Sequence, residues 1–381
     1  MTAPGLEPFT VDVAPAVLDD LRERLRRTRW PEDEPVADWS QGVPAAYLRD
    51  LCRYWAEEYD WPARQQLLNR FPQYRTTVDG LGIHLIHVPS PHPGAMPLVL
   101  THGWPGSVVE FLDVIGPLTD PVAHGGDARD AFSVVCPSLP GYGWSDRPAR
   151  TGWGVEAIAA AWAEIMSRLG YQRFGAQGGD WGAEVTRALA DAFPDRLTGI
   201  HLNMVTVRPD REPEGGLTDA EQRALGRLAE HREQGTGYST QQATRPQTLG
   251  YGLTDSPAGQ LAWILEKFAV WADCDLDPVA ALGADRLLDN AMLYWVPATA
   301  ASSARLYRES FRRPGWPPTS VPTGAAIFPH EIVTPSRRWA ERAFLDLRRW
   351  SELPAGGHFA ALEQPDVLVA EVRAFFRTVR I

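Results

Sequence analysis

The chain has 381 residues and a mass of 42.2 kDa, which corresponds to two domains or to one large domain with an insertion. Hydrophobic residues make up 44% and charged residues 22%, a globular composition that excludes a disordered or collagen-like chain. The formal net charge of −11 disfavours a nucleic-acid-binding protein, because such proteins need a basic surface to meet phosphate.

Cysteine usage and apolar segments predict the compartment. Cys52, Cys136 and Cys274 are far apart and form no Cys-x-x-Cys pair, so we expect neither a disulfide framework nor a cysteine metal site. No stretch reaches 18 apolar residues, and the first residues lack the basic start and apolar run of a secretory signal. We therefore expect a soluble, cytoplasmic protein that does not associate with membranes.

Residues 1–75 are predicted to be helical. Two sets of large side chains recur there at helical spacing: Leu18, Leu21 and Leu25, and then Tyr47, Leu51 and Tyr54. The pattern changes at Thr76. From there 76–78 and 83–88 flank Asp79-Gly80, a dipeptide typical of a β-hairpin turn.

Apolar strands and amphipathic helices then alternate along the chain. We expect strands at 97–101, 132–136, 174–177 and 197–205, helices at 153–169 and 183–193, and, nearer the C-terminus, strands at 323–328 and 350–353 with helices at 336–342 and 367–379. This order predicts an α/β fold, a mostly parallel sheet with helices on both faces. The alternation stops over 208–316, a helical and loop-like segment with a polar stretch at 234–248, which we interpret as an insertion.

Gly178-Gly179-Asp180-Trp181-Gly182 lies between a predicted strand and a predicted helix. A sharp strand-to-helix turn needs small residues around its tip and lifts the tip side chain above the sheet, as in a nucleophile elbow. The tip here is Asp180. The alternative is a glycine-rich turn in which Asp180 only caps the following helix.

Two further side chains follow later strands in the order that such a fold uses, an acid and then a histidine. Glu331 comes after the 323–328 strand and His358 after the last strand. The carboxyl ends of parallel strands share one edge of the sheet, so we expect both near Asp180. Alone, each has a structural alternative: Glu331 could begin a helix, and His358 could be a loop histidine.

His102-Gly103-Trp104-Pro105 follows an earlier strand, where this fold places an oxyanion donor. We predict that the backbone N–H groups of Trp104 and Trp181 hold a developing negative oxygen, and that His102 itself is structural.

A carboxylate nucleophile suits attack on a saturated carbon with a strained or good leaving group, and it forms an ester that water must cleave. Epoxide opening and carbon–halogen displacement both fit. Epoxide opening needs an acid for the ring oxygen, a role that a phenol can take. The insertion offers four: Tyr238, Tyr251, Tyr294 and Tyr307.

With these motifs the sequence resembles the microsomal-type epoxide hydrolases, a branch of the α/β-hydrolase superfamily with an N-terminal helical meander. The resemblance extends over nearly the whole chain and includes the segments 102–107, 177–182, 253–257, 264–268, 294–295, 328–331 and 356–361. It implies a meander at 1–75, a first core part at 76–207, a helical cap at 208–316 and a second core part at 317–381.

By the same resemblance Asp180 is the nucleophile, His358 the base, Glu331 its orienting acid, and Tyr238 and Tyr307 the ring-opening acids. It implies an epoxide substrate and water, with no cofactor and no metal. Membrane-bound members carry an N-terminal anchor, whereas this sequence starts with the meander. The composition is compatible with a bacterial source and favours a role in secondary metabolism, such as the epoxides of enediyne pathways. Whether the protein is a monomer or a homodimer stays open.

Other interpretations are weaker. A dehalogenase and a catalytically inactive binding module of the same fold remain the alternatives. Gly141-Tyr142-Gly143 is too short for a dinucleotide-binding motif. The acidic residues 273, 275, 277, 285 and 289 lack the spacing of a calcium loop, and we interpret them as a solvated acidic face.

Overall fold

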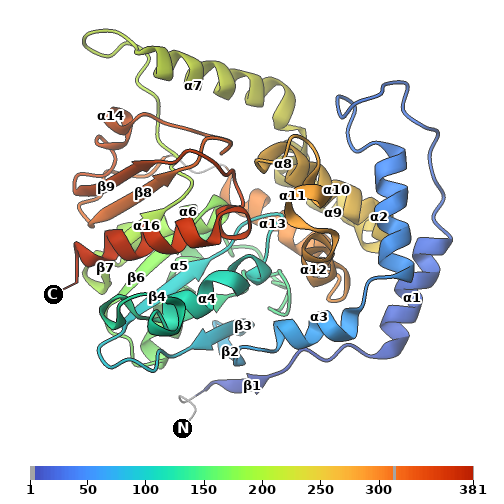
Figure 1. The fold of residues 1–381 in the computed structure, drawn as a ribbon, viewed down its shortest axis with the longest axis horizontal. Helices are drawn as coiled ribbons and strands as arrows, with labels where there is room; N and C mark the ends of the chain where they lie inside the picture. Colours follow the sequence, from blue (N-terminus) through green and yellow to red (C-terminus); the bar gives the residue numbers. More distant parts are fainter. Residues whose placement is uncertain (1–4, 312–314, 381) are drawn as a thin grey trace.

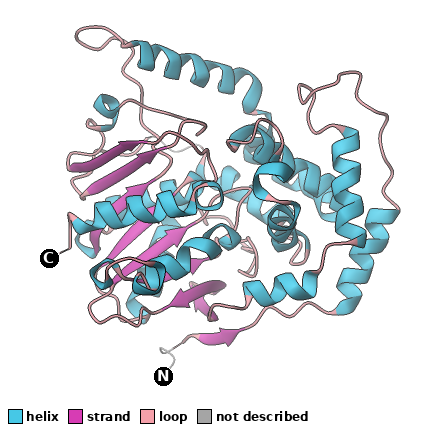
Figure 2. Ribbon diagram, viewed as in Figure 1, coloured by secondary structure: helices cyan, strands magenta, loops and turns pink. Residues whose placement is uncertain are grey.

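A computed structural model describes residues 5–311 and 315–380. Within them the sheet has nine strands in the order β1-β2-β3-β5-β4-β6-β7-β8-β9 (Figures 1 and 2). The strands are β1 (Glu7–Phe9), β2 (Gln73–Val78), β3 (Leu81–Val88), β4 (Met96–Thr101), β5 (Phe132–Pro137), β6 (Phe174–Gly178), β7 (Leu197–Leu202), β8 (Thr323–Ile327) and β9 (Leu347–Glu352). Pairing is parallel from β5 to β9 and antiparallel among β1, β2, β3 and β5, which confirms the predicted α/β fold.

Helices cover both faces of this sheet. One face carries α4 (Leu112–Thr119) and α16 (Pro365–Arg377), and the other carries α5 (Val155–Arg168) and α6 (Asp180–Ala192) (Figure 1). The short helices α14 (Arg337–Ala340) and α15 (Ala360–Glu363) flank β9 in the sequence. Of these, α4 and α15 are absent from the prediction. No helix among the described residues is both long and apolar enough to cross a bilayer.

The N-terminal segment is mostly helical, as predicted, with α1 (Pro15–Arg26), α2 (Ala45–Glu57) and α3 (Trp61–Leu68). Leu18, Leu21 and Leu25 are buried on α1 as expected. Two strands were missed or misplaced. β1 adds an edge to the sheet, and β2 begins at Gln73 rather than at Thr76. The hairpin turn at Asp79-Gly80 is confirmed, with φ of 49° and 75°.

The segment between β7 and β8 contains seven α-helices in its described part. They are α7 (Asp219–Glu230), α8 (Gly237–Thr244), α9 (Pro246–Asp255), α10 (Pro257–Trp271), α11 (Pro278–Leu282), α12 (Ala284–Trp295) and α13 (Ala300–Ser310). The polar stretch 234–248 is largely helical, because α8 and the start of α9 occupy it. The insertion therefore has more regular structure than its polar composition suggested, while its limits as a domain stay a prediction.

The interpretation of the acidic residues as a solvated face is wrong for Asp289, which is buried, whereas Asp275 and Asp277 are exposed as expected. The hydroxyl groups of three N-terminal tyrosines donate hydrogen bonds to three of these carboxylates: Tyr47 to Asp277 (2.7 Å), Tyr54 to Asp285 (2.8 Å) and Tyr59 to Asp289 (2.8 Å). Arg64 also pairs with Asp289, which is only 2% exposed. Through Asp277, Asp285 and Asp289 the cluster thus joins the N-terminal helices to the insertion, whereas no such bond is formed by Asp275 among the described residues.

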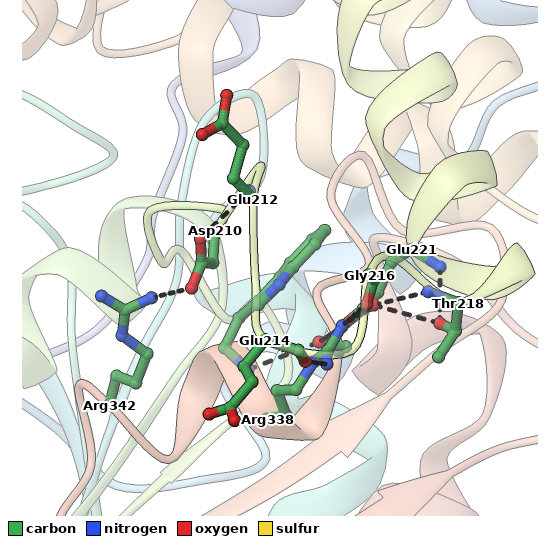
Figure 3. A network of polar contacts seen from close by, with 10 residues as sticks. Asp210, Glu212, Glu214, Gly216, Thr218, Glu221, Arg338 and Arg342 are labelled. Atoms are coloured by element: carbon green, nitrogen blue, oxygen red, sulfur yellow. Dashed lines mark hydrogen bonds and ion pairs between the residues drawn. The ribbon is translucent and has the colours of Figure 1, made fainter.

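Helix α7 lies along the top of the molecule in Figure 1, apart from the other helices of the insertion. Its first turn is fixed to the core by a cluster that we name the clasp, formed by Thr218, Glu221, Ser336 and Arg338. Figure 3 labels Thr218, Glu221 and Arg338 of this cluster. Thr218 and Glu221 form a capping box, and the buried Glu221 carboxylate accepts hydrogen bonds from Ser336 (2.7 Å) and from Arg338 Nε (2.9 Å). The clasp therefore holds α7 to α14.

Candidate active site

Asp180 lies at the tip of a sharp turn between β6 and α6. Its φ is +48°, a left-handed conformation that non-glycine residues adopt rarely and mostly at functional turns. The neighbouring glycines are required by close approach. A Cβ atom on Gly178 would lie 2.2 Å from the Gly182 carbonyl oxygen, and one on Gly182 would lie 1.8 Å from the Thr101 oxygen. The predicted strand–turn–helix is present, although α6 begins at Asp180 itself.

Asp180, His358 and Glu331 come together, although they lie at three separate strand ends. His358 Nε2 is 3.6 Å from Asp180 Oδ2, and His358 Nδ1 is 2.7 Å from Glu331 Oε1. His358 and Glu331 are each 5% exposed, and the helix that follows Glu331 begins only at Arg337, so Glu331 does not start a helix. The second Glu331 oxygen, Oε2, has no hydrogen-bond partner within residues 5–311 and 315–380.

The charges in this group depend on one another. Burial alone would lower the pKa of His358, but the charge and hydrogen bond of Glu331 and the charge of Asp180 raise it to about 9. Burial raises the pKa of Asp180, while His358 and the N–H groups of Trp104 and Trp181 counteract that rise. The imidazole is therefore cationic at neutral pH in the free protein and favours the ionised form of Asp180.

The two predicted N–H donors both reach Asp180. The Trp104 N–H donates to Asp180 Oδ1 at 2.8 Å, and the Trp181 N–H also bonds the carboxylate. His102 is buried, and both ring nitrogens engage the backbone: Nδ1 lies 2.9 Å from the Gly103 oxygen, and Nε2 accepts from the Leu139 N–H at 3.1 Å. His102 therefore shapes the loop that presents Trp104, as the sequence analysis expected.

Tyr238 and Tyr307 lie over the same two tryptophans. Tyr238 stacks on Trp104 with ring centroids 5.1 Å apart, and Tyr307 meets Trp181 edge-on at 4.8 Å. Their own rings are 5.8 Å apart. The buried Tyr307 hydroxyl faces the Tyr238 hydroxyl and the Trp181 ring N–H but forms no hydrogen bond of good geometry in the described part of the chain, so it can turn its proton to a bound ligand.

The other two candidate phenols are elsewhere. Tyr251 is 70% exposed, and the Tyr294 hydroxyl donates to the Gly106 carbonyl oxygen at 2.7 Å. Neither lines the cavity above Asp180.

A cavity of about 1300 Å³ opens above Asp180, and both phenols line it. Its walls come from the loop after β7, from α7 and from the loop after β8, and its apolar lining includes Met204, Val207, Leu225, Leu228, Phe311 and Ile332. Such a space accepts a bulky apolar ligand with its reactive end on Asp180.

Two ionisable residues near the site were not among the predicted site residues. Lys267 is buried with its Nζ 4.4 Å from the centroid of the Tyr238 ring. Glu110, in the 3₁₀ turn Val108–Phe111, lines a second and smaller cavity beside Asp180 and His358. Lys267 lies within a segment on which the family resemblance depends, whereas no motif in the sequence singles out Glu110.

Comparison with known proteins gives matches over the whole chain. The family model "Epoxide hydrolase N terminus" matches residues 6–111, and an α/β-hydrolase fold model matches residues 96–234. A protein of Stigmatella aurantiaca that is provisionally named an epoxide hydrolase is 53% identical over 99% of this chain and 86% of its own length. Epoxide hydrolase 1 of Oryctolagus cuniculus is 35% identical over 97% of this chain and 88% of its own.

Solved structures agree with these relatives. The juvenile hormone epoxide hydrolase of Bombyx mori superposes with a TM-score of 0.90 at 31% identity, covering 98% of this chain and 95% of the other. The epoxide hydrolase of Aspergillus niger gives a TM-score of 0.89 at 31% identity, covering 100% and 97%. The chain therefore belongs to the epoxide hydrolase family of α/β-hydrolase-fold enzymes.

Proposed function

We propose that this protein converts an epoxide to a vicinal diol in two chemical steps. In the first step an Asp180 oxygen attacks an epoxide carbon, the carbon–oxygen bond of the ring breaks, and Tyr238 and Tyr307 supply hydrogen bonds and a proton to the leaving oxygen. The product of this step is a hydroxyalkyl ester of Asp180.

In the second step water cleaves that ester. His358, oriented by Glu331, takes a proton from the water, whose oxygen attacks the Asp180 carboxyl carbon. The Trp104 and Trp181 N–H groups stabilise the oxyanion that forms there. Collapse of this intermediate breaks the acyl carbon–oxygen bond and releases the diol, which receives its proton from the imidazolium. The second proton of the water, left on the Asp180 carboxyl group, replaces the proton that the phenol gave up and restores the carboxylate.

One observation supports the proposal above the others. The buried phenol of Tyr307 and the partly buried phenol of Tyr238 line the same cavity as a carboxylate that is held by two N–H donors and a Glu–His pair. Phenols suit an epoxide oxygen, which must gain a proton, better than a halide, which needs only hydrogen-bond donors. The size and apolar lining of the cavity favour a bulky, apolar epoxide.

Isotope labelling in a single turnover tests the covalent route. With enzyme in excess over styrene oxide in ¹⁸O-water, the first diol should carry almost no label, because its new oxygen comes from Asp180. The label should appear in the enzyme and then in the diol of later turnovers. Fully labelled diol in the first turnover would mean that water attacks the epoxide directly, and it would overturn the role given to Asp180.

A further inference from the structure

The carboxyl group of Asp180 separates two cavities of very different size. The large one holds the two phenols, and the small one, about 20 Å³, is lined by His358, Glu110, Gln177 and Asn203 among others. Among the described residues Asp180 alone lines both. A ligand in one cavity and a small molecule in the other would therefore meet the same carboxylate from two directions.

The small cavity has the size and lining of a site for one water molecule. A buried water needs about 10–15 Å³ of accessible space and two to four polar partners. The cavity offers about 20 Å³ and at least five residues with polar side chains, including Asp180. A substituted epoxide is too large for this cavity. Water can therefore occupy the small cavity, while the epoxide can bind only in the large one.

Glu110 is folded back over its own loop to reach this cavity. Its Oε1 lies 1.5 Å from the place where a Cβ atom of Gly106 would be, so only a glycine at 106 leaves room for it. The Ser107 N–H bonds the carboxyl group. Within the described part of the chain no Lys or Arg side chain forms an ion pair with Glu110 of the kind that neutralises Glu221 or Asp289.

The electrostatics of Glu110 also link it to the reacting groups. Burial raises the pKa of Glu110 to about 8; the charge of His358 opposes this rise and that of Asp180 adds to it. At neutral pH the carboxyl group is therefore mostly uncharged in the free enzyme. In either protonation state it keeps an oxygen that can accept a hydrogen bond.

We propose that the small cavity binds the water that cleaves the ester and that Glu110 is a catalytic residue, which accepts one O–H of this water while His358 accepts the other. With both O–H groups directed in this way, a lone pair of the oxygen faces the Asp180 carboxyl carbon. The proton of the attacking water passes to His358, and Glu110 gains and loses none. This inference rests on the two-step function proposed above.

Rapid-quench single turnovers with styrene oxide, followed by mass spectrometry of the protein, separate the two steps. Glu110→Met replaces the carboxyl group by an apolar chain of similar length. We expect ester formation at the wild-type rate and ester hydrolysis slowed about 10–100-fold, because the water loses its orientation. The ester on Asp180 should then accumulate. Glu110→Gln keeps an acceptor oxygen and should hydrolyse the ester within a few-fold of the wild-type rate.

A second variant leaves Glu110 itself intact. In Gly106→Ala the new methyl group occupies the position of Glu110 Oε1 and displaces the carboxyl group, so this variant should also slow hydrolysis selectively. If circular dichroism shows that Glu110→Met does not fold, the rate of ester hydrolysis in Gly106→Ala tests the role of Glu110 in its place. Glu164→Met, at a half-exposed position of α5, is the matched control and should match the wild type in both steps.

These experiments distinguish a wrong role for Glu110 from a wrong two-step function. If wild type and His358→Gln form no ester on Asp180, the two-step function itself fails. If the ester forms but Glu110→Met and Gly106→Ala hydrolyse it at the wild-type rate, or slow ester formation instead, the role of Glu110 is wrong and the two-step function stands. Equally slow hydrolysis in Glu110→Gln and Glu110→Met would also contradict an acceptor role.

Discussion

His358 is placed to meet two successive states of Asp180. Before reaction the carboxylate is negative, and its charge contributes to the raised pKa of His358, about 9. Ester formation removes that charge, so the pKa of His358 must fall. The ring can then lose its proton and act as a base in the second step. In the two-step route that we propose, the same imidazole thus keeps the nucleophile ionised first and activates water afterwards.

At this scale we expect the two phenols to share the work of the acid. Each of Tyr238→Phe and Tyr307→Phe should keep part of the activity, because the remaining hydroxyl can still polarise the epoxide oxygen. In the double variant the rate of ester formation should fall about 10²–10⁴-fold, because general acid catalysis typically accelerates a reaction by this factor. Pre-steady-state measurement of ester formation checks this. A double variant with full activity would place the acid elsewhere.

The residues of the candidate site differ in how far the sequence could identify them. Asp180, Glu331 and His358 follow strands in a recognisable order, and all three meet in the structure. Glu110 has no such signal, because its importance depends on a turn that folds its side chain back past Gly106. Tyr238 and Tyr307 could be separated from the other two phenols only by the family resemblance, since helix packing decides which hydroxyl reaches the cavity.

At the scale of elements, α7 forms one wall of the large cavity and is fixed at its first turn by the clasp. The hydrogen bonds of Arg338, together with those of Ser336 and Thr218, lower the pKa of Glu221 to about 2. A folded-state pKa below the ordinary value of 4.5 means that the clasp is stabilising above pH 4.5. Its contribution is lost as the pH falls toward 2.

We therefore expect Glu221→Gln to loosen α7 at neutral pH, because the amide cannot hold the Arg338 charge. Limited proteolysis should cut residues 219–235 faster in this variant than in the wild type, and the wild type should approach the same rate only below about pH 4, with an acid-stable protease such as pepsin. Glu214→Gln, at an exposed position beside the clasp, is the control and should be cut like the wild type. Equal cutting of Glu221→Gln and wild type at pH 7 would show that other contacts hold the helix.

On the scale of the whole molecule, the N-terminal helices are docked on the insertion through tyrosine–aspartate hydrogen bonds. Asp289 is the most buried of these acceptors and binds both Tyr59 and Arg64. Asp289→Asn removes the charge that Arg64 neutralises but keeps the shape. We expect the free energy of unfolding to fall by about 1–3 kcal/mol, since the partly buried guanidinium keeps only the longer ion pair with Asp285, at 3.6 Å.

Urea denaturation followed by tryptophan fluorescence measures this loss. Asp275→Asn, at an exposed position of the same acidic cluster, should change the free energy of unfolding by less than about 0.5 kcal/mol. A loss in Asp289→Asn as small as that of the control would mean that apolar packing alone docks the N-terminal helices.

The overall fold follows from the sequence to a large extent, because strand and helix patterns of different period alternate clearly over the core. Two kinds of feature could not be predicted from the sequence in this way. The edge strand β1 is only three residues long, too short for any periodic pattern, and α4 contains Gly116 and Pro117, which obscure a helical signal. The docking role of the acidic cluster depends on residues about 230 positions earlier, which local patterns do not reveal.

The same long separation affects how the chain acquires its structure as it is made. Tyr47, Tyr54 and Tyr59 leave the ribosome 230 or 231 residues before the carboxylates that they bind. At about 5–20 residues per second that interval is on the order of 10–50 s. During most of this time α1 and α2 can pack on each other but not on the helices of the insertion, of which α10 contacts both. Nascent chains that stop before residue 277 should therefore depend on chaperones, whereas chains that extend past Asp289 can bury the apolar faces of these helices on themselves.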